Sequence, residues 1–330
     1  MSQKYISHRQ RIENCLSGQQ LDRPPVALWR HFPVDDQHPD SLASAHLHFQ
    51  KTYDFDLVKV TPASSFCLRD WGIMDEWRGA TEGTREYVSR VIHKPDDWDK
   101  LPILNPSADH LASQLACLRI LVKELGQSTP IIQTIFNPLS QAKNLVGSNK
   151  LLVHIRRYPE QFHTGLETIA RSTRRFVEAA LETGIAGVFF AVQHAQFGLL
   201  SVDEFDSFGR HYDLQVLEPA QNAWLNVLHL HGGDVMFKNL IDYPVSVINW
   251  HDRETEPTLA DAQTMFPGVV CGGLSRLSTI VLGTPSDVYT ESEIAIRDTN
   301  SSRFILGTGC VTPINAPHGN LLAVRQSVEK

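Results

Sequence analysis

The sequence predicts an α/β fold, a (β/α)8 or TIM barrel formed by a single domain that spans residues 1–330. Short apolar segments bounded by Gly, Pro or polar turns recur along the chain, and stretches with helical periodicity separate most of them. There are about eight such segments, the number of strands that this barrel requires. Two of them end in potential metal ligands, which can meet only where a fold gathers many strand ends at one mouth.

Strands and helices alternate along most of the sequence. The predicted strands are Pro25–Arg30, Asp56–Thr61, Pro130–Phe136, Gly187–Ala191, Leu225–His231, Val245–Asn249, Gly268–Gly272 and Arg303–Leu306. From Pro159 to Thr183 apolar residues recur at helical spacing, and Gly184 supplies a C-terminal stop. A helix over Thr284–Ala295 is indicated by Thr284 as N-cap and Pro285 at the first helical position.

Residues 65–105 depart from this alternation. They follow the second predicted strand and are rich in Trp, Arg and acidic side chains. We expect a long, lid-like excursion that covers the barrel mouth, with a β-hairpin at 86–94. No internal repeat, low-complexity tract or linker is present, which favours one domain.

Composition excludes several classes of protein. The net charge is −7 and no cluster of Lys and Arg stands out, so nucleic acid is not an expected partner. The N-terminal residues lack the apolar core of a signal peptide and no later stretch is long and apolar enough to cross a bilayer, which predicts a cytoplasmic protein without a membrane partner. Five scattered cysteines are expected to be reduced thiols. Gly272-Gly273 lacks the third glycine of a dinucleotide fingerprint, so neither NAD nor flavin is expected.

The ends of the fifth and eighth predicted strands carry the candidate metal ligands. His229 and His231 are two residues apart on one strand, so their side chains point to the same side. Cys310 follows the last strand, next to two glycines. Two imidazoles and a thiolate form a zinc-binding set that leaves a fourth position for water or substrate. Taken alone, a buried cysteine is more often a small hydrophobe than a ligand.

Other strand ends contribute polar and aromatic candidates, because active sites of such barrels lie at the carboxyl ends of the strands. These are Arg30, Thr61, Asn137, Gln193, His194, Asn249, Trp250 and His251. For His194 and His251 taken singly, a hydrogen-bonded structural role is the common alternative. For Trp250 the alternative to a functional role is packing in the core or in the lid.

These residues resemble the uroporphyrinogen decarboxylase (URO-D) superfamily. The resemblance rests on Asp22–Val26 with Trp29-Arg30, the strand at 54–60, His229–Gly232, and Leu306–Cys310 followed by Pro313 and Pro317. It extends over nearly the full chain, although no single motif is specific. It implies a (β/α)8 barrel and one of two activities, decarboxylation in porphyrin synthesis or zinc-dependent methyl transfer involving corrinoids or thiols.

The decarboxylase branch of this superfamily has motifs that the chain matches only in part. That branch carries an Arg-x-x-x-Arg motif, an Asp after the second strand, a Tyr and a late His. Arg30 matches the first arginine, but Val34 stands at the second. Thr61 replaces the Asp, Asn144 the Tyr and Thr308 the late His. Loss of the carboxylate removes charge-assisted bonds to pyrrole N–H groups, which argues against decarboxylation of uroporphyrinogen.

The methyltransferase branch is the closer match. It binds zinc through a His-x-Cys pair and a later Cys in a Gly-Cys turn. His229 and Cys310 match these positions, whereas His231 stands where the middle cysteine would be. The resemblance therefore implies a zinc-dependent methyltransferase acting on a small molecule or corrinoid, with uroporphyrinogen decarboxylase and a non-catalytic corrinoid- or tetrapyrrole-binding barrel as alternatives.

The resemblance also implies roles and partners. His229, His231 and Cys310 would hold zinc, and His251, His194 and Gln193 would position groups or move protons. The substrate-binding candidates are Arg30, which would hold a carboxylate, Thr61, Asn137, Asn249 and Trp250. We expect a small-molecule substrate, a corrinoid or corrinoid protein as methyl carrier, and a homodimer.

Overall fold

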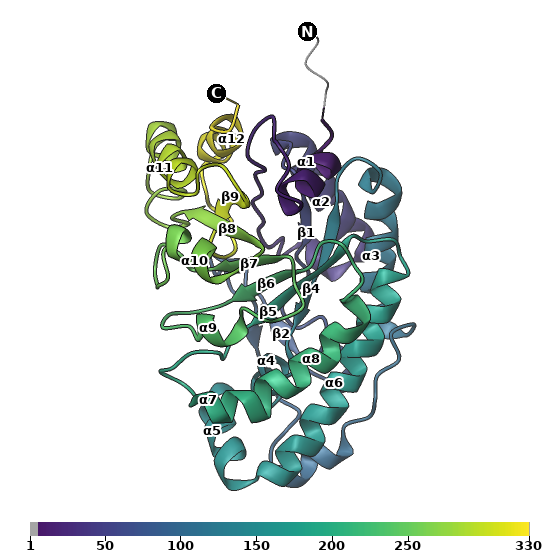
Figure 1. The fold of residues 1–330 in the computed structure, drawn as a ribbon. Coiled ribbons are helices and arrows are strands. Elements are labelled where there is room, and N and C mark those ends of the chain that lie inside the picture. Colours follow the sequence, from purple (N-terminus) through teal and green to yellow (C-terminus); the bar gives the residue numbers. More distant parts are fainter. Residues whose placement is uncertain (1–5, 330) are drawn as a thin grey trace.

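The computed structural model describes residues 6–329, and its centre is a curled sheet of seven parallel strands (Figure 1). The strands are β1 Val58–Val60, β4 Ile131–Phe136, β5 Gly187–Val192, β6 Val227–Leu230, β7 Val247–Trp250, β8 Val269–Leu274 and β9 Phe304–Thr308. Their order in the sheet, β1-β4-β5-β6-β7-β8-β9, is their order along the chain. Since all are parallel, the loops that follow them leave from the same edge of the sheet.

The first of the eight predicted strands, Pro25–Arg30, is not formed as a strand. Val26 makes a single parallel bridge to Leu306 of β9, and the amide of Asp56 donates to the carbonyl of Val26 at 2.8 Å. A longer ladder is prevented because Pro25 has no N–H and the N–H of Val26 donates to the Asp56 carboxylate at 2.8 Å. A complete eight-stranded barrel is therefore not observed, and seven of the eight predicted strands are confirmed.

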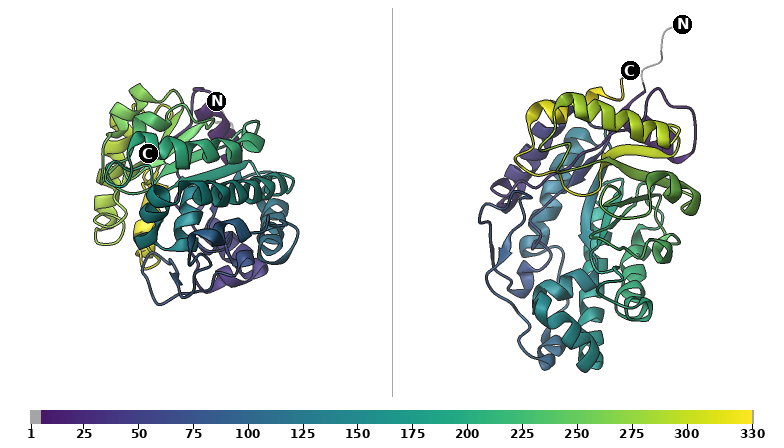
Figure 2. Two further views of the ribbon diagram at one scale, coloured as in Figure 1. Left: turned by 90° about the horizontal axis from the view of Figure 1, so that it is seen from below. Right: turned by 90° about the vertical axis from the view of Figure 1, so that its left-hand side faces the viewer.

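Helices cover the outer face of the sheet (Figures 1 and 2). They are α1 His8–Leu16, α2 Pro39–Tyr53, α3 Asp109–Leu125, α4 Pro138–Val146, α5 Ser148–Arg157, α6 Pro159–Leu181, α7 Val202–Phe205, α8 His211–Leu217, α9 Phe237–Leu240, α10 Leu259–Met265, α11 Pro285–Asp298 and α12 His318–Gln326. The two helices predicted in detail are confirmed as α6 and α11. In α11 the Thr284 hydroxyl accepts from the amide of Asp287, as a capping box requires.

Apolar side chains are divided between two layers, because successive residues of a strand face opposite sides. In β6, Leu228 and Leu230 pack outward against the helices, whereas Val227 belongs to a smaller cluster inside the curled sheet. The same alternation turns His229 inward, where it stacks on Phe189 with ring centroids 5.2 Å apart. The inner layer ends at the carboxyl edge of the sheet in polar residues.

The excursion contains a small hairpin, but not at the predicted residues. β2 (Asp75–Glu76) pairs antiparallel with β3 (Glu86–Tyr87), so the hairpin prediction for 86–94 is wrong. The pairing segment lies upstream because the Asp75 carboxylate is buried and pairs with Arg69 and Arg85, each at 2.9 Å. These ion pairs fix the first strand of the hairpin ahead of the turn.

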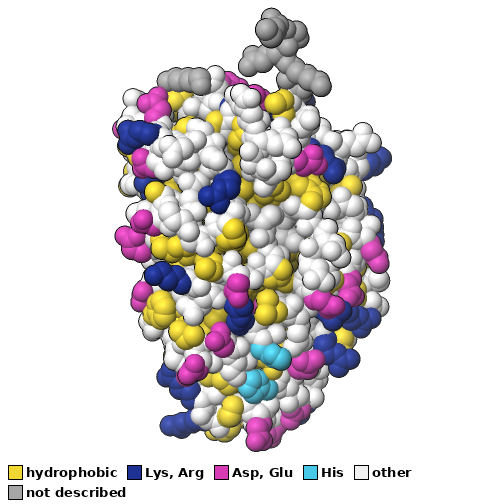
Figure 3. Space-filling view, viewed as in Figure 1, with side chains coloured by type: hydrophobic (Ala, Val, Ile, Leu, Met, Phe, Trp, Pro, Cys, Tyr) yellow, Lys and Arg dark blue, Asp and Glu magenta, His cyan; other side chains and the backbone are white. Residues whose placement is uncertain are grey.

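No helix within residues 6–329 is long and apolar enough to cross a membrane. On the face drawn in Figure 3, acidic and basic side chains are interspersed.

Candidate metal centre

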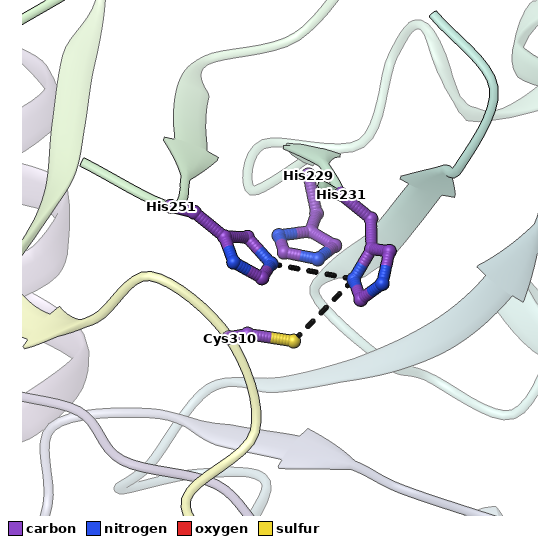
Figure 4. Close-up of side chains that lie close together, drawn as sticks. All are labelled: His229, His231, His251 and Cys310. Atoms are coloured by element: carbon purple, nitrogen blue, oxygen red, sulfur yellow. Dashed lines mark hydrogen bonds between the residues drawn. The ribbon is translucent and has the colours of Figure 1, made fainter. Parts of the chain in front are cut away.

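Four side chains converge at the carboxyl edge of the sheet, and they point toward one another (Figure 4). They are His229 and His231 at the end of β6, His251 after β7 and Cys310 after β9. One potential ligand atom from each lies within 4.8 Å of those of the other three. His231 Nδ1 lies 3.3 Å from His251 Nε2 and 3.6 Å from Cys310 Sγ.

The strand register explains why these residues meet. His229 is paired with Asn249, and Leu230 with Trp250, so His231 and His251 follow at equivalent positions on neighbouring strands. Gly309 allows the segment after β9 to approach closely, since a Cβ there would lie 2.5 Å from the carbonyl oxygen of Trp250. The thiol of the next residue is thereby brought to the two strand ends.

Hydrogen bonds orient two of the imidazoles. Asn249 donates its amide N–H groups to the carbonyls of Cys271 and Thr308, at 2.9 and 3.1 Å. Its Oδ1 must therefore accept from His229 Nδ1, 2.7 Å away, which leaves His229 Nε2 with a lone pair. Likewise Glu254 Oε2 lies 3.2 Å from Nδ1 of His251. A carboxylate there favours a proton on Nδ1 and therefore a lone pair on Nε2 of His251.

Burial keeps the imidazoles neutral. Desolvation, with a smaller contribution from the neighbouring rings, lowers the pKa of His231 to about 4 and that of His229 well below its usual value. Desolvation also lowers the pKa of His251, although Glu254 opposes it. Burial raises the pKa of the Cys310 thiol, which the charge of Arg276 partly offsets. Three neutral imidazoles and one protonated thiol are a donor set that exchanges a single proton for a metal ion.

The geometry fits zinc. Ideal tetrahedral zinc places two ligand nitrogens about 3.3 Å apart, and a nitrogen and a sulfur about 3.6 Å apart. The His231–His251 and His231–Cys310 separations, 3.3 and 3.6 Å, match these values. His251, predicted as a proton-moving residue, thus lies among the three predicted ligands. The four could fill a tetrahedral site, or three could bind and leave one position open.

A pocket with a free volume of about 90 Å³ lies against the cluster. His229, His231 and Cys310 form part of its wall, and among the other predicted site residues Thr61 and Gln193 line it. Further lining residues outside the predicted set include His31, Lys59, Glu82 and Thr84. The alternation of side chains along a strand could have indicated His31 and Lys59. His31 lies two residues after Trp29 and Lys59 two residues before Thr61, so each faces the same side of its segment as a residue that lines the pocket.

Arg30 and Trp250, both predicted to bind substrate, point away from this pocket. Arg30 lies over the ring of Phe32, 5.1 Å from its centroid, in a separate groove beside α2. Trp250 is fully buried in the outer layer, and its Nε1 donates to the carbonyl of Pro257 at 3.0 Å. Each immediately precedes an inward-facing histidine, so the alternation of side chains turns it outward.

Three further candidates are buried beside the pocket without lining it. Asn249 is the hydrogen-bonding support of His229 described above. Asn137 caps α4 and donates to Asp213 at 3.0 Å. His194 lies 3.5 Å from the hydroxyl of Ser140, and burial lowers its pKa to about 3. These contacts are with other protein side chains and do not test the predicted roles. Substrate binding by Asn137 and proton transfer by His194 therefore stay predictions.

The excursion at 65–105 is connected to His251, one of the four candidate ligands, through a chain of charged side chains. Glu82, which lines the pocket, pairs with Arg276 after β8, and Arg276 Nε lies 3.2 Å from Glu254 Oε1. Glu254 is in turn the partner of His251. A residue of the excursion is therefore tied to a potential ligand through two charged side chains.

Comparisons with known proteins agree on the fold. A methyltransferase from Methanosarcina mazei has a similar structure, with a TM-score of 0.85 and 15% identity over 98% of both chains. A B12-independent methionine synthase from Shewanella sp., in complex with selenomethionine, has a TM-score of 0.57 and 14% identity, and the match covers 87% of this chain and 86% of that one. At these identities the likeness concerns the fold alone.

Sequence comparison is informative at the level of the family. No curated protein sequence matches the chain. The family profile described as uroporphyrinogen decarboxylase (URO-D) matches residues 7–330, which include all four candidate metal ligands. Since this match spans nearly the whole sequence, the chain belongs to the uroporphyrinogen decarboxylase (URO-D) family.

Proposed function

We propose that the protein is a zinc-dependent methyltransferase that acts on a small molecule. The observation that carries the proposal is the cluster of His229, His231, His251 and Cys310, in which the separations of His231 from His251 and from Cys310 match those of tetrahedral zinc. Bound zinc would act as a Lewis acid and lower the pKa of a nucleophile at the open position. The printed names of the two structural neighbours, a methyltransferase and a methionine synthase, are consistent with methyl transfer.

Residues around this centre would orient the ligands and accept the proton of the nucleophile. Asn249 and Glu254 hold His229 and His251 with their second ring nitrogens directed inward. If zinc is held by three ligands, His251 remains beside the open position and can accept the proton that the nucleophile loses as it gains the methyl group. Phe189 and Phe136 contribute an apolar part of the pocket wall.

Pocket size favours a small substrate. A cavity of about 150 Å³ holds a molecule as large as benzene, so about 90 Å³ accommodates a compact substrate and not a tetrapyrrole. This argues against uroporphyrinogen decarboxylation inside the pocket. A corrinoid methyl carrier would have to present its methyl group at the mouth, and we propose a corrinoid protein as the partner that does so.

Metal analysis of protein purified without a histidine tag tests the proposal. We expect about one zinc per chain in the wild type and a clear loss in His231→Ala. His194→Ala is a matched control, because His194 is also buried at a strand end but does not line the pocket. Absence of stoichiometric zinc from the wild type would refute the proposal, as would equal zinc content in both variants.

Methyl transfer itself is tested with methylcobalamin as donor and a panel of small thiols and alcohols as acceptors. Zinc-loaded wild-type protein should convert methylcobalamin to demethylated cobalamin, followed by its visible spectrum. Zinc-free protein is the control. Zinc binding without any methyl transfer across the panel would leave the metal centre in place and refute its assignment to this reaction.

A further inference from the structure

The pocket contains a buried lysine that is not paired with a carboxylate. Lys59 in β1 is 5% exposed and lines the same pocket as His229, His231 and Cys310. Its Nζ donates to the Thr61 hydroxyl at 3.3 Å and lies 4.7 Å from the centroid of the Phe189 ring. Within residues 6–329 it forms no ion pair. An ammonium has three N–H donors, so two remain for a group inside the pocket.

The structural alternative is that Phe189 and Thr61 compensate the buried charge by themselves. A cation–π contact with one hydroxyl offsets only part of the cost of removing an ammonium from water. Burial accordingly lowers the pKa of Lys59 to about 7, although the nearby Cys310 opposes this shift. A bound anion would restore the missing counter-charge and hold the ammonium protonated.

A second residue in the pocket also lacks a partner. His31 is 6% exposed, and its Nδ1 is buried without a hydrogen bond. Its ring is hydrogen-bonded to the backbone of Pro62, which can only accept, so Nε2 is the donor and Nδ1 carries a lone pair. His31 therefore offers an acceptor where Lys59 offers donors. Buried polar groups normally have partners, and an unpaired imidazole nitrogen in the same pocket as an ammonium with a single hydrogen bond points to a missing ligand.

We infer that Lys59 binds an anionic oxygen group of the substrate while His31 accepts a hydrogen bond from a neighbouring hydroxyl or amino group. The substrate class is a small hydroxy- or amino-carboxylate, or another small oxyanion with a donor beside it. This inference rests on the proposed function, because it concerns the substrate of the same pocket. Lys59 and His31 are thus specificity-determining residues that touch the substrate.

The probes are glycolate, which has both groups, acetate, which lacks the hydroxyl, and glycolamide, which lacks the charge. Binding to zinc-loaded protein is measured by isothermal titration calorimetry. Wild-type protein should prefer glycolate to glycolamide. Lys59→Met should weaken glycolate binding about tenfold or more and leave glycolamide nearly unchanged, since one charge-assisted hydrogen bond is lost. His31→Ala should remove the preference for glycolate over acetate.

Controls separate this site from general effects on charge and folding. Lys123→Met removes an exposed lysine of α3 that does not line the pocket, and should leave all three affinities unchanged. Lys59→Gln is a second variant at the site, and circular dichroism and zinc content verify that each variant is folded and metallated.

Several results would overturn the inference. Equal affinity of the wild type for glycolate and glycolamide would do so, as would no measurable binding of either acid, or unaltered selectivity in both Lys59 variants. The proposed function is tested separately by zinc content. If the wild type binds zinc but does not discriminate among the probes, only this inference fails. If it binds no zinc, the same comparison on metal-free protein still tests Lys59.

Discussion

At position 231 an imidazole faces the thiol of Cys310 and the imidazole of His251. The resemblance to URO-D-like methyltransferases implied a cysteine at this position. With histidine there, the centre has one thiolate in place of two, which makes a bound metal a stronger Lewis acid. The identity of this single residue would therefore tune how strongly the centre activates a nucleophile.

The support that Asn249 gives to His229 can be removed without touching a ligand. Asn249→Ala should lower zinc affinity by about 10- to 100-fold while the stoichiometry is kept, because the tautomer of His229 is no longer fixed. Competition with a chromophoric chelator measures the affinity. Asn226→Ala is the matched control, since Asn226 is also buried and hydrogen-bonded but supports the backbone of Val188. Equal affinities in the two variants would contradict the role of Asn249.

Zinc binding should depend on pH through Cys310. The imidazoles are neutral at pH 7, because burial lowers the pKa of each, that of His231 to about 4. The raised pKa of the thiol means that zinc must displace its proton, so affinity should rise with pH, by about tenfold per unit. Titration of zinc into weakly buffered protein should release about one proton per zinc at pH 7. Cys310→Ala should release none, and release of several protons would show that the histidines are charged.

Among single residues, the sequence was informative wherever strand alternation applied. His229, His231 and Cys310 meet as predicted. Arg30 and Trp250 were chosen as strand-end polar or aromatic residues, but each occupies the outward-facing position. His31 and Lys59 lie one residue away and face the pocket. A shift of one residue along a strand moves a side chain to the opposite face of the sheet. The chemical type of a side chain does not by itself reveal which of the two faces it occupies.

At the scale of elements, the excursion at 65–105 is the part that departs most from regular alternation. Its hairpin pairs Asp75–Glu76 with Glu86–Tyr87, because two partly buried arginines converge on Asp75. Such long-range charge contacts leave no periodic signal in the sequence. Helices α6 and α11, by contrast, were predictable because periodicity, caps and stop residues are local.

The link from Glu82 through Arg276 to Glu254 should hold the excursion over the pocket. Arg276→Met should cost about 1 kcal/mol of local stability and speed hydrogen exchange at the amide of Gly83 about fivefold, because both carboxylates lose their partner. Exchange monitored by NMR measures this. Arg78→Met is the control, since Arg78 lies in the same excursion and pairs with the exposed Glu76 and Glu86. Unchanged exchange in Arg276→Met would show that the excursion is held by other contacts.

At the scale of the whole molecule, Asp56 joins the two ends of the sheet. It is fully buried and accepts from Arg11 and Arg23, each at 2.6 Å, from His8 at 2.9 Å and from the amide of Val26 at 2.8 Å. These contacts attach α1 and the segment at 25–30 to β1. Where the first predicted strand, 25–30, is incomplete, a buried carboxylate thus replaces part of its backbone hydrogen bonding.

Replacing this carboxylate should destabilise the protein strongly. Burial alone would raise the pKa of Asp56, but the hydrogen bond from His8 and the charges of Arg23 and Arg11 outweigh it and lower the pKa well below its usual range. A depressed acid pKa contributes stability that is present above the unfolded value and is lost as pH falls through the folded one. Asp56→Asn should therefore cost about 3–5 kcal/mol at pH 7, and its deficit should shrink in acid.

Urea unfolding at a series of pH values measures this deficit. Asp54→Asn is the matched control, because Asp54 pairs with His8 and Arg325 but is more than half exposed. It should cost less than about 1 kcal/mol at any pH. A pH-independent deficit in Asp56→Asn would contradict the ionic origin of the effect.

What the sequence determined by itself is the set of local properties: an α/β fold with alternating strands and helices, the caps of α11, and the inward pair His229 and His231. The tertiary structure decided what lies next to what. It brought His251 to the other three candidate metal ligands, placed Lys59 and His31 in the pocket, placed Arg30 beside another groove, and left the first predicted strand, 25–30, as a single bridge. The physical reason is that periodicity specifies the side of a strand on which a residue lies, whereas its neighbours depend on strand register and on buried contacts between segments far apart in the chain.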